Sequence, residues 1–188
     1  MRSPSPAARR LTVTFVAALA IAASAPALVV TASAEPSAQS PSVEGSPDLK
    51  IQLSDLDPTG YTVGWGDLYR NASYDNTPLT LLVDGEERDF GHGLFAHAPS
   101  TICLNDIRDY GFERFEAWVG IGDTARVNGK RALVVFRVVG DGEVLWESGE
   151  MSESSEAEHV SVDVSSVSVL ELVAEAADRS SEIGRAHV

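Results

Sequence analysis

The chain has 188 residues, enough for one domain with additional segments. Its formal net charge is −14, and it has a single cysteine, Cys103. Such a negative charge repels nucleic acid and anionic membrane surfaces, so we expect neither as a partner of the mature protein. One cysteine also excludes an internal disulfide, so the fold must depend on an apolar core, with Cys103 expected as a small buried group in it.

Residues 1–34 have the layout of a secretory signal peptide. Arginines at the start precede an uncharged apolar run over residues 11–25, and Ala32-Ser33-Ala34 is a small-residue cleavage site. The run is shorter than the ~20 apolar residues of a membrane-spanning helix, although a membrane anchor is the alternative interpretation. We therefore predict a secreted protein that is cleaved after Ala34 and has no membrane segment in its mature form. Residues 35–47, rich in Ser, Pro and Ala, are predicted to be a flexible linker.

Residues 48–182 are predicted to form one domain built of strands. Residues 160–164 alternate apolar and polar side chains, as strands with one buried face do. Residues 132–139 are almost continuously apolar, broken only by Arg137, which predicts a strand buried on both faces or nearly so. Asp84-Gly85 predicts a tight hairpin turn. Roughly ten short strands of this kind indicate an all-β fold, an antiparallel β-sandwich with a jelly-roll-like arrangement.

The sequence offers no marked catalytic or metal-binding motif. There is no Gly-x-Ser-x-Gly nucleophile elbow and no Cys/His cluster with zinc spacing. His92 and His97 are five residues apart, so on one strand they would point to opposite faces, and a shared metal would need a bend at Gly93. Pairs of carboxylates that could act as acid and base cannot be judged from residue counts. We therefore assign no catalytic residue.

Two positions have the features of a sugar-binding site, which combines an aromatic ring with a few fixed polar groups. Trp65 lies between Gly64 and Gly66, which would leave its ring uncrowded, although it could equally be a core aromatic. His97 precedes a proline turn and could stand at a loop rim, or be a structural histidine inside that turn. Trp118 and Trp146 are expected to be covered or in the core.

Several segments resemble the NPCBM modules, which are the family 51 carbohydrate-binding modules. The matching segments are Leu53-Ser54-Asp55-Leu56 with Gly64-Trp65-Gly66, Gly91-His92-Gly93-Leu94 with His97-Ala98-Pro99-Ser100, and residues 112–122, 134–142 and 160–173. The resemblance implies a galactose-binding-like β-sandwich that binds glycans, often galactose-containing ones, without catalysing a reaction. It further implies a covalently linked glycoside hydrolase, and in some members a structural calcium; no other cofactor is implied.

By the same resemblance, Trp65 and His97 are the first candidates for sugar contacts, and Asn71 and Asp123 are secondary ones. The chain departs from the family at two of the relevant positions. Many relatives have Gly at the position of Phe95, and many have Asp at that of Gly122, which leaves Asp123 as the only acid there. The identity of the sugar and of any metal ligand therefore stays open.

The end of the chain departs further from the family pattern. Residues 183–188, Ile-Gly-Arg-Ala-His-Val, are what a sequencing-adapter string encodes, so we expect them to be a non-native tail. The strand that closes the sandwich in relatives would then be missing, leaving an unpaired sheet edge.

The function that these observations predict is glycan binding that holds a linked glycoside hydrolase near its substrate. One alternative is that the chain is the N-terminal fragment of a secreted glycoside hydrolase whose catalytic domain is missing. Another is a structural or adhesion β-sandwich without sugar specificity.

Overall fold

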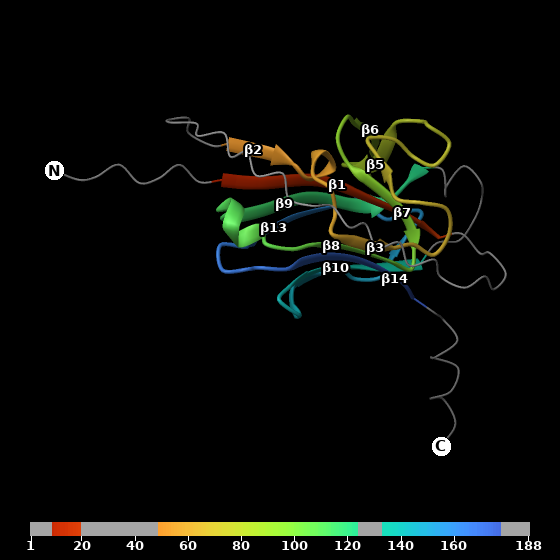
Figure 1. Cartoon of the computed structure of the whole chain (residues 1–188). Coiled ribbons are helices and arrows are strands. Elements are labelled where there is room, and N and C mark those ends of the chain that lie inside the picture. The colour runs from red at the N-terminus through yellow and green to blue at the C-terminus, as the bar shows by residue number, and fades with distance from the viewer. Residues whose placement is uncertain (1–8, 20–48, 124–132, 178–188) are drawn as a thin grey trace, which may run out of the picture.

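The protein is a sandwich of two six-stranded β-sheets with a separate two-stranded hairpin (Figure 1). The computed structural model describes residues 9–19, 49–123 and 133–177. The predicted linker 35–47 and the predicted tail 183–188, with the missing strand expected there, lie outside the described residues. In the described part of the chain, no helix is long and apolar enough to cross a membrane.

The strands follow one another along the described chain with only two short 3-10 helices between them. They are β1 (Arg9–Leu19), β2 (Leu49–Gln52), β3 (Gly60–Thr62), β4 (Tyr69–Arg70), β5 (Leu79–Val83), β6 (Glu86–Phe90), β7 (Leu94–Ala98), β8 (Ser100–Leu104), β9 (Arg114–Ile121), β10 (Leu133–Gly140), β11 (Glu143–Glu147), β12 (Met151–Ser152), β13 (Glu158–Asp163) and β14 (Leu170–Ala176), with η1 (Leu53–Asp55) and η2 (Ile107–Tyr110). The predicted all-β sandwich is confirmed.

The first sheet has the order β13-β9-β1-β7-β4, with β2 also paired to β1. The second has the order β11-β10-β14-β8-β3, with β12 also paired to β10. All pairings in the second sheet are antiparallel, as predicted. The first sheet differs, because β1 runs parallel to β2, β7 and β9. Within the predicted signal peptide, residues 9–19 thus form an inner strand, and cleavage after Ala34, which stays a prediction, would remove it.

The inward faces of the two sheets form one apolar core. Phe115 on β9, Phe136 on β10 and Val160 on β13 are all buried in it. Outward residues on the same strands are polar or half-buried, because successive side chains of a strand point to opposite faces. The prediction that residues 132–139 are buried on both faces or nearly so holds in full only for the inner face. Burial alternates along β10 between buried and half-buried residues, and Arg137 on its outer face pairs with Glu147 and Glu175.

The β5–β6 hairpin covers a second, smaller apolar cluster. Its turn, Asp84-Gly85, has positive φ at both residues, 54° and 80°, as predicted for a two-residue hairpin loop. Leu79, Leu81 and Val83, on the inner face of β5, pack against Phe95 of β7. The hairpin therefore lies over the strand that carries the predicted His97.

Cys103 on β8 is half-buried, and its thiol donates a hydrogen bond to Glu171 Oε1 at 3.5 Å. Burial, with a smaller effect of the Glu171 carboxylate, raises the pKa of the thiol to about 11. Because the thiolate is the reactive form, we expect alkylation by iodoacetamide at pH 8 to be about 100-fold slower than for an ordinary thiol. Glu171→Gln should lower the pKa of the thiol and accelerate the reaction. A rate profile that rises near pH 8.5 in the unmodified protein would contradict this.

Asp141 holds the β10–β11 turn against the start of β14. It has a φ of 50°, and its carboxylate accepts hydrogen bonds from the backbone N–H groups of Val169, at 2.8 Å, and Ser168, at 3.1 Å. These backbone bonds lower the pKa of Asp141, so its carboxylate stabilises the fold above the unfolded-state pKa, and that contribution is lost as the pH falls through the folded-state value. We expect Asp141→Asn to lower the thermal midpoint at pH 7, with the difference shrinking below about pH 4. Thermal unfolding followed by circular dichroism from pH 3 to pH 7 measures this, and a difference that does not change with pH would refute it.

Candidate functional site

The candidate site begins with the loop between β3 and β4, residues 63–68, which lies on the end of β7. The Gly64 N–H donates a hydrogen bond to the His97 carbonyl at 2.9 Å. A Cβ at Gly64 would lie 2.6 Å from the Ala98 carbonyl oxygen and 2.9 Å from Pro99 Cδ. Only glycine therefore allows the loop to approach β7 this closely.

Asp67 holds the other end of this loop. Its Oδ1 accepts hydrogen bonds from the Tyr61 hydroxyl at 2.7 Å and from the Leu68 N–H at 2.8 Å. The bond to Asp67 raises the pKa of the Tyr61 phenol, which stays protonated and continues to donate. The loop is thus fixed on both sides of Trp65.

Trp65 is exposed and packs edge-to-face against the rings of His97, which is buried, and Tyr74, which is half-buried. Its exposed fraction is 47%, whereas that of His97 is 4%. The Trp65 and His97 ring centroids are 5.0 Å apart at an interplanar angle of 90°, and Tyr74 packs against Trp65 at 6.1 Å and 80°. Phe95 packs beneath His97 at 5.1 Å. An indole supported in this way keeps apolar surface in solvent, which is the chemistry needed to pack on the C–H face of a pyranose.

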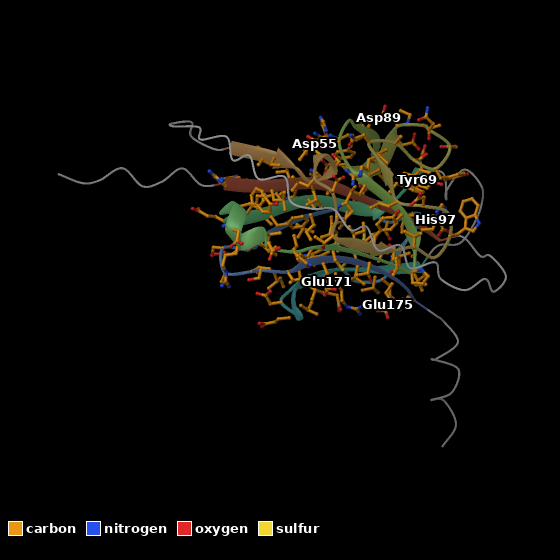
Figure 2. The ribbon with its side chains drawn as sticks, viewed as in Figure 1. Asp55, Tyr69, Asp89, His97, Glu171 and Glu175 are labelled. Atoms are coloured by element: carbon orange, nitrogen blue, oxygen red, sulfur yellow. The ribbon has the colours of Figure 1, made fainter. Side chains whose placement is uncertain are left out.

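Figure 2 shows His97 at one end of the first sheet, with Tyr69 from the neighbouring strand nearby. Sequence reasoning brought Trp65 and His97 together correctly, but His97 lies within β7, not on a loop rim. Its ring supports Trp65 from below.

Asp123 lies at the same end of the sheet as His97. Ile121 of β9 and Ala96 of β7 both pair with Ala17 of β1, which places Asp123 one residue beyond the row of His97. β7 and β9 lie on either side of β1, so their backbones are roughly 10 Å apart. Asp123 is half-buried.

Asn71 lies farther away. Its backbone N–H donates to the Gly93 carbonyl at 2.8 Å, and its Oδ1 accepts from the Gly93 N–H at 3.0 Å. Gly93 precedes His97 by four residues on an extended chain, a distance of roughly 13 Å. Asn71 has a φ of 59°, so its observed contacts are those of a residue that connects β4 to β7.

The comparisons with known proteins agree with this fold. Residues 50–187 match the model of the NPCBM/NEW2 domain family. The chain belongs to this family. A search of curated proteins found no match.

Solved structures similar to this NPCBM/NEW2 domain are carbohydrate-binding modules. One is CBM51 from Clostridium perfringens GH95 in complex with methyl-galactose, which is 30% identical with a TM-score of 0.63 over 69% of this chain and 89% of that one. Another is CBM51-2 in complex with GlcNAc, with INT domains, from Clostridium perfringens ZmpB: 27% identical, TM-score 0.63, over 70% of this chain and 30% of that one. A third contains the tandem CBM51 modules of Sp3GH98, the family 98 glycoside hydrolase from Streptococcus pneumoniae SP3-BS71: 26% identical, TM-score 0.59, over 69% and 42%. The chain spans 29% of the length of a two-domain ZmpB structure that it also matches.

In this NPCBM/NEW2 domain, Tyr74 is the site residue that sequence reasoning missed. It contacts both Trp65 and His97, the latter at 5.5 Å, and is half-buried. Nothing in its local sequence distinguishes it, because it lies in a polar loop between β4 and β5. Its position follows only from how that loop returns over β7.

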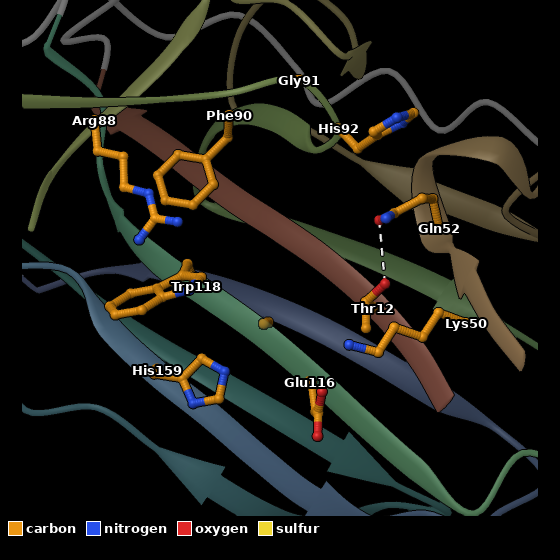
Figure 3. A pocket seen from close by; sticks show the side chains of 11 residues that line it. Thr12, Lys50, Gln52, Arg88, Phe90, Gly91, His92, Glu116, Trp118 and His159 are labelled. Carbon is orange, nitrogen blue, oxygen red and sulfur yellow. Dashed lines mark hydrogen bonds between the residues drawn. The ribbon is translucent and has the colours of Figure 1, made fainter. Parts of the chain in front are cut away.

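A hollow of about 430 Å³ lies on the outer face of the first sheet (Figure 3). None of the four predicted site residues lines it. Trp118 forms part of its wall, with His159 at 5.1 Å and Phe90 at 6.4 Å between ring centroids. The Arg88 guanidinium covers this group at 6.0 Å from the Trp118 ring, so Trp118 is partly covered by the hairpin, as expected.

No three Asp, Glu, His or Cys side chains converge in the described part of the chain. Many relatives have Asp at the position of Gly122, so Asp123 is the acid that this chain has there. The structural calcium therefore remains a prediction, and we derive no role for it.

Proposed function

We propose that this domain binds a terminal pyranose of galactose type at the end of the first sheet, with Trp65 as the stacking surface. The observation that carries the proposal is an exposed indole braced by two further rings on a loop fixed at both ends. His97 and Tyr74 set the orientation of the indole. Asp67, in the same loop, and Asp123, at the same end of the sheet, are the acids that we assign to accept hydrogen bonds from sugar hydroxyls. The bound methyl-galactose in the similar GH95 module supports a galactose-type ligand.

In this proposal the domain does no bond chemistry and holds a linked glycoside hydrolase near its glycan. Similar modules occur beside catalytic domains, as in the structure of the M60 catalytic domain with CBM51-1 and CBM51-2 from ZmpB. A shallow site buries little ligand surface, so a single site binds weakly, and tethering to an enzyme raises the effective concentration of the ligand. The predicted signal peptide fits the same role, because it would export the module to where such glycans are found.

A glycan array with the purified chain, followed by calorimetric titration of the glycans that bind, tests this. We expect binding to galactose-terminated glycans, competition by methyl-galactoside, and weaker competition by GlcNAc. A folded protein that binds no glycan would instead support a structural or adhesion domain. Hydrolysis of a bound glycan by this chain alone would contradict the non-catalytic assignment.

A further inference from the structure

The inner strand β1 occupies a position that two other strands define. One of its edges pairs with β9 from Arg10↔Arg114 to Ala17↔Ile121, and the other pairs with β2 and then with β7 from Phe15↔Leu94 to Leu19↔Ala98. Figure 1 shows β1, in red, running along β9. Without β1, the edges of β7 and β9 that face each other would have no partner strand, and the gap between them would be one strand wide.

Unpaired edges of this kind bind extended chains, because each backbone N–H and C=O on them needs a partner. Here two edges face one strand position, so an incoming chain is paired on both sides. The base of the position is the apolar core: Leu11 is fully buried there, level with Phe115. The position therefore favours an extended apolar segment.

The first residues of β1 fix its direction and register. Arg10 forms an ion pair with Glu116 at 3.0 Å, and Thr12 Oγ1 donates to Gln52 Oε1 at 3.1 Å (Figure 3). The Glu113 N–H donates to the Arg9 carbonyl at 2.9 Å. These contacts come from the segment itself, so its binding does not depend on the 29 residues, 20–48, that connect it to β2.

We propose that the position between β7 and β9 is a strand-acceptor site, which binds an extended apolar segment of the β1 pattern in parallel orientation without a covalent connection. It is filled by β1 in the full-length chain. Removal of β1 by cleavage at Ala34 before folding would leave the position for another segment of this pattern. This inference is independent of glycan binding, and its test uses no sugar.

The test uses the full chain with a protease recognition site inserted between Ala38 and Gln39, in the predicted linker. After folding and cutting, we expect the N-terminal fragment to co-elute with the rest of the protein in size-exclusion chromatography. A fluorescent peptide of residues 9–19 with a C-terminal lysine tail should then displace it, measured by anisotropy. The same peptide with Leu11→Asp should bind at least about 100-fold more weakly, because it would bury a carboxylate.

Three results would overturn the proposal. One is prompt loss of the fragment from a body that stays monomeric with an unchanged thermal midpoint. The second is equal binding of the two peptides. The third is that the protein unfolds when the fragment is released and does not refold when the peptide of residues 9–19 is added. Refolding with that peptide, but not with the Leu11→Asp peptide, would support the proposal.

Discussion

Trp65→Ala is expected to reduce glycan affinity by about 30-fold or more, because it removes the only exposed ring of the described aromatic cluster. A central aromatic anchor typically contributes about 2 kcal/mol or more to binding, and 1.4 kcal/mol corresponds to a factor of ten. The fold should be retained, since nearly half of the Trp65 side chain is already in solvent. Calorimetric titration with the best glycan from the array, together with the thermal midpoint of each variant, measures both effects.

The matched control for this substitution is Trp118→Ala. Trp118 is also a tryptophan of this part of the fold, but its described ring contacts are with His159, Phe90 and Arg88, in the hollow on the outer face. We expect this variant to bind glycan like the native protein. If Trp118→Ala loses binding and Trp65→Ala keeps it, the sugar site is the outer hollow, and the assignment to Trp65 is wrong.

The hairpin and the sandwich were predictable because local sequence determines them. Asp84-Gly85 requires positive φ, and alternating residues in β13 require one buried face. The difference at β10 has a physical cause: apolar residues on its outer face are half-exposed beside Arg137, whose charge is paired across to Glu147 and Glu175. A run of apolar residues predicts that a strand is buried, but it does not show whether one face of the strand or both are covered.

The position of β1 could not be predicted, because the N-terminal arginines, the apolar run over residues 11–25 and the Ala32-Ser33-Ala34 site together indicate a signal peptide at residues 1–34. The same properties, an apolar run with no charge, also suit an inner strand paired on both edges. Which of the two applies depends on whether β7 and β9 leave a position between them, and this is a property of the sheet.

At the site, the Gly64-Trp65-Gly66 pattern allowed either an exposed ring or a core aromatic, and the ring is exposed. The positions of the other candidate residues depend on tertiary contacts. His97 was identified, but its burial follows from its place in β7 beneath the β3–β4 loop. Asn71 and Asp123 are found near opposite ends of the described strands, because Asn71 is in register with Gly93 and Asp123 follows Ile121. Sequence separation gives no indication of either distance.

Gly64→Ala is expected to destabilise the protein by about 1–3 kcal/mol and to reduce glycan affinity as strongly as Trp65→Ala does. The three atoms nearest to the added methyl group are the carbonyl oxygen and carbon of Ala98 and Cδ of Pro99, all within 2.9 Å. The first two are backbone atoms and the third is in a proline ring, so none of them can move away by a side-chain rotation. The loop must therefore lift from β7, which breaks the bond from Gly64 N–H to His97 and moves the Trp65 ring away from its supporting rings. Urea unfolding and calorimetric titration measure the two effects.

Gly60→Ala is the matched control, because an added Cβ at Gly60 meets no atom within 4 Å and the position is in the neighbouring strand β3. It should leave both stability and affinity close to those of the native protein. Because Gly64→Ala retains Trp65, comparing it with Trp65→Ala separates the effect of the loop's position on affinity from the effect of the indole itself. Native affinity in Gly64→Ala, with binding lost in Trp65→Ala, would mean that the ring contacts sugar without needing its support on His97. Loss in both variants would mean that the close approach of Gly64 to β7 is what makes Trp65 a binding surface.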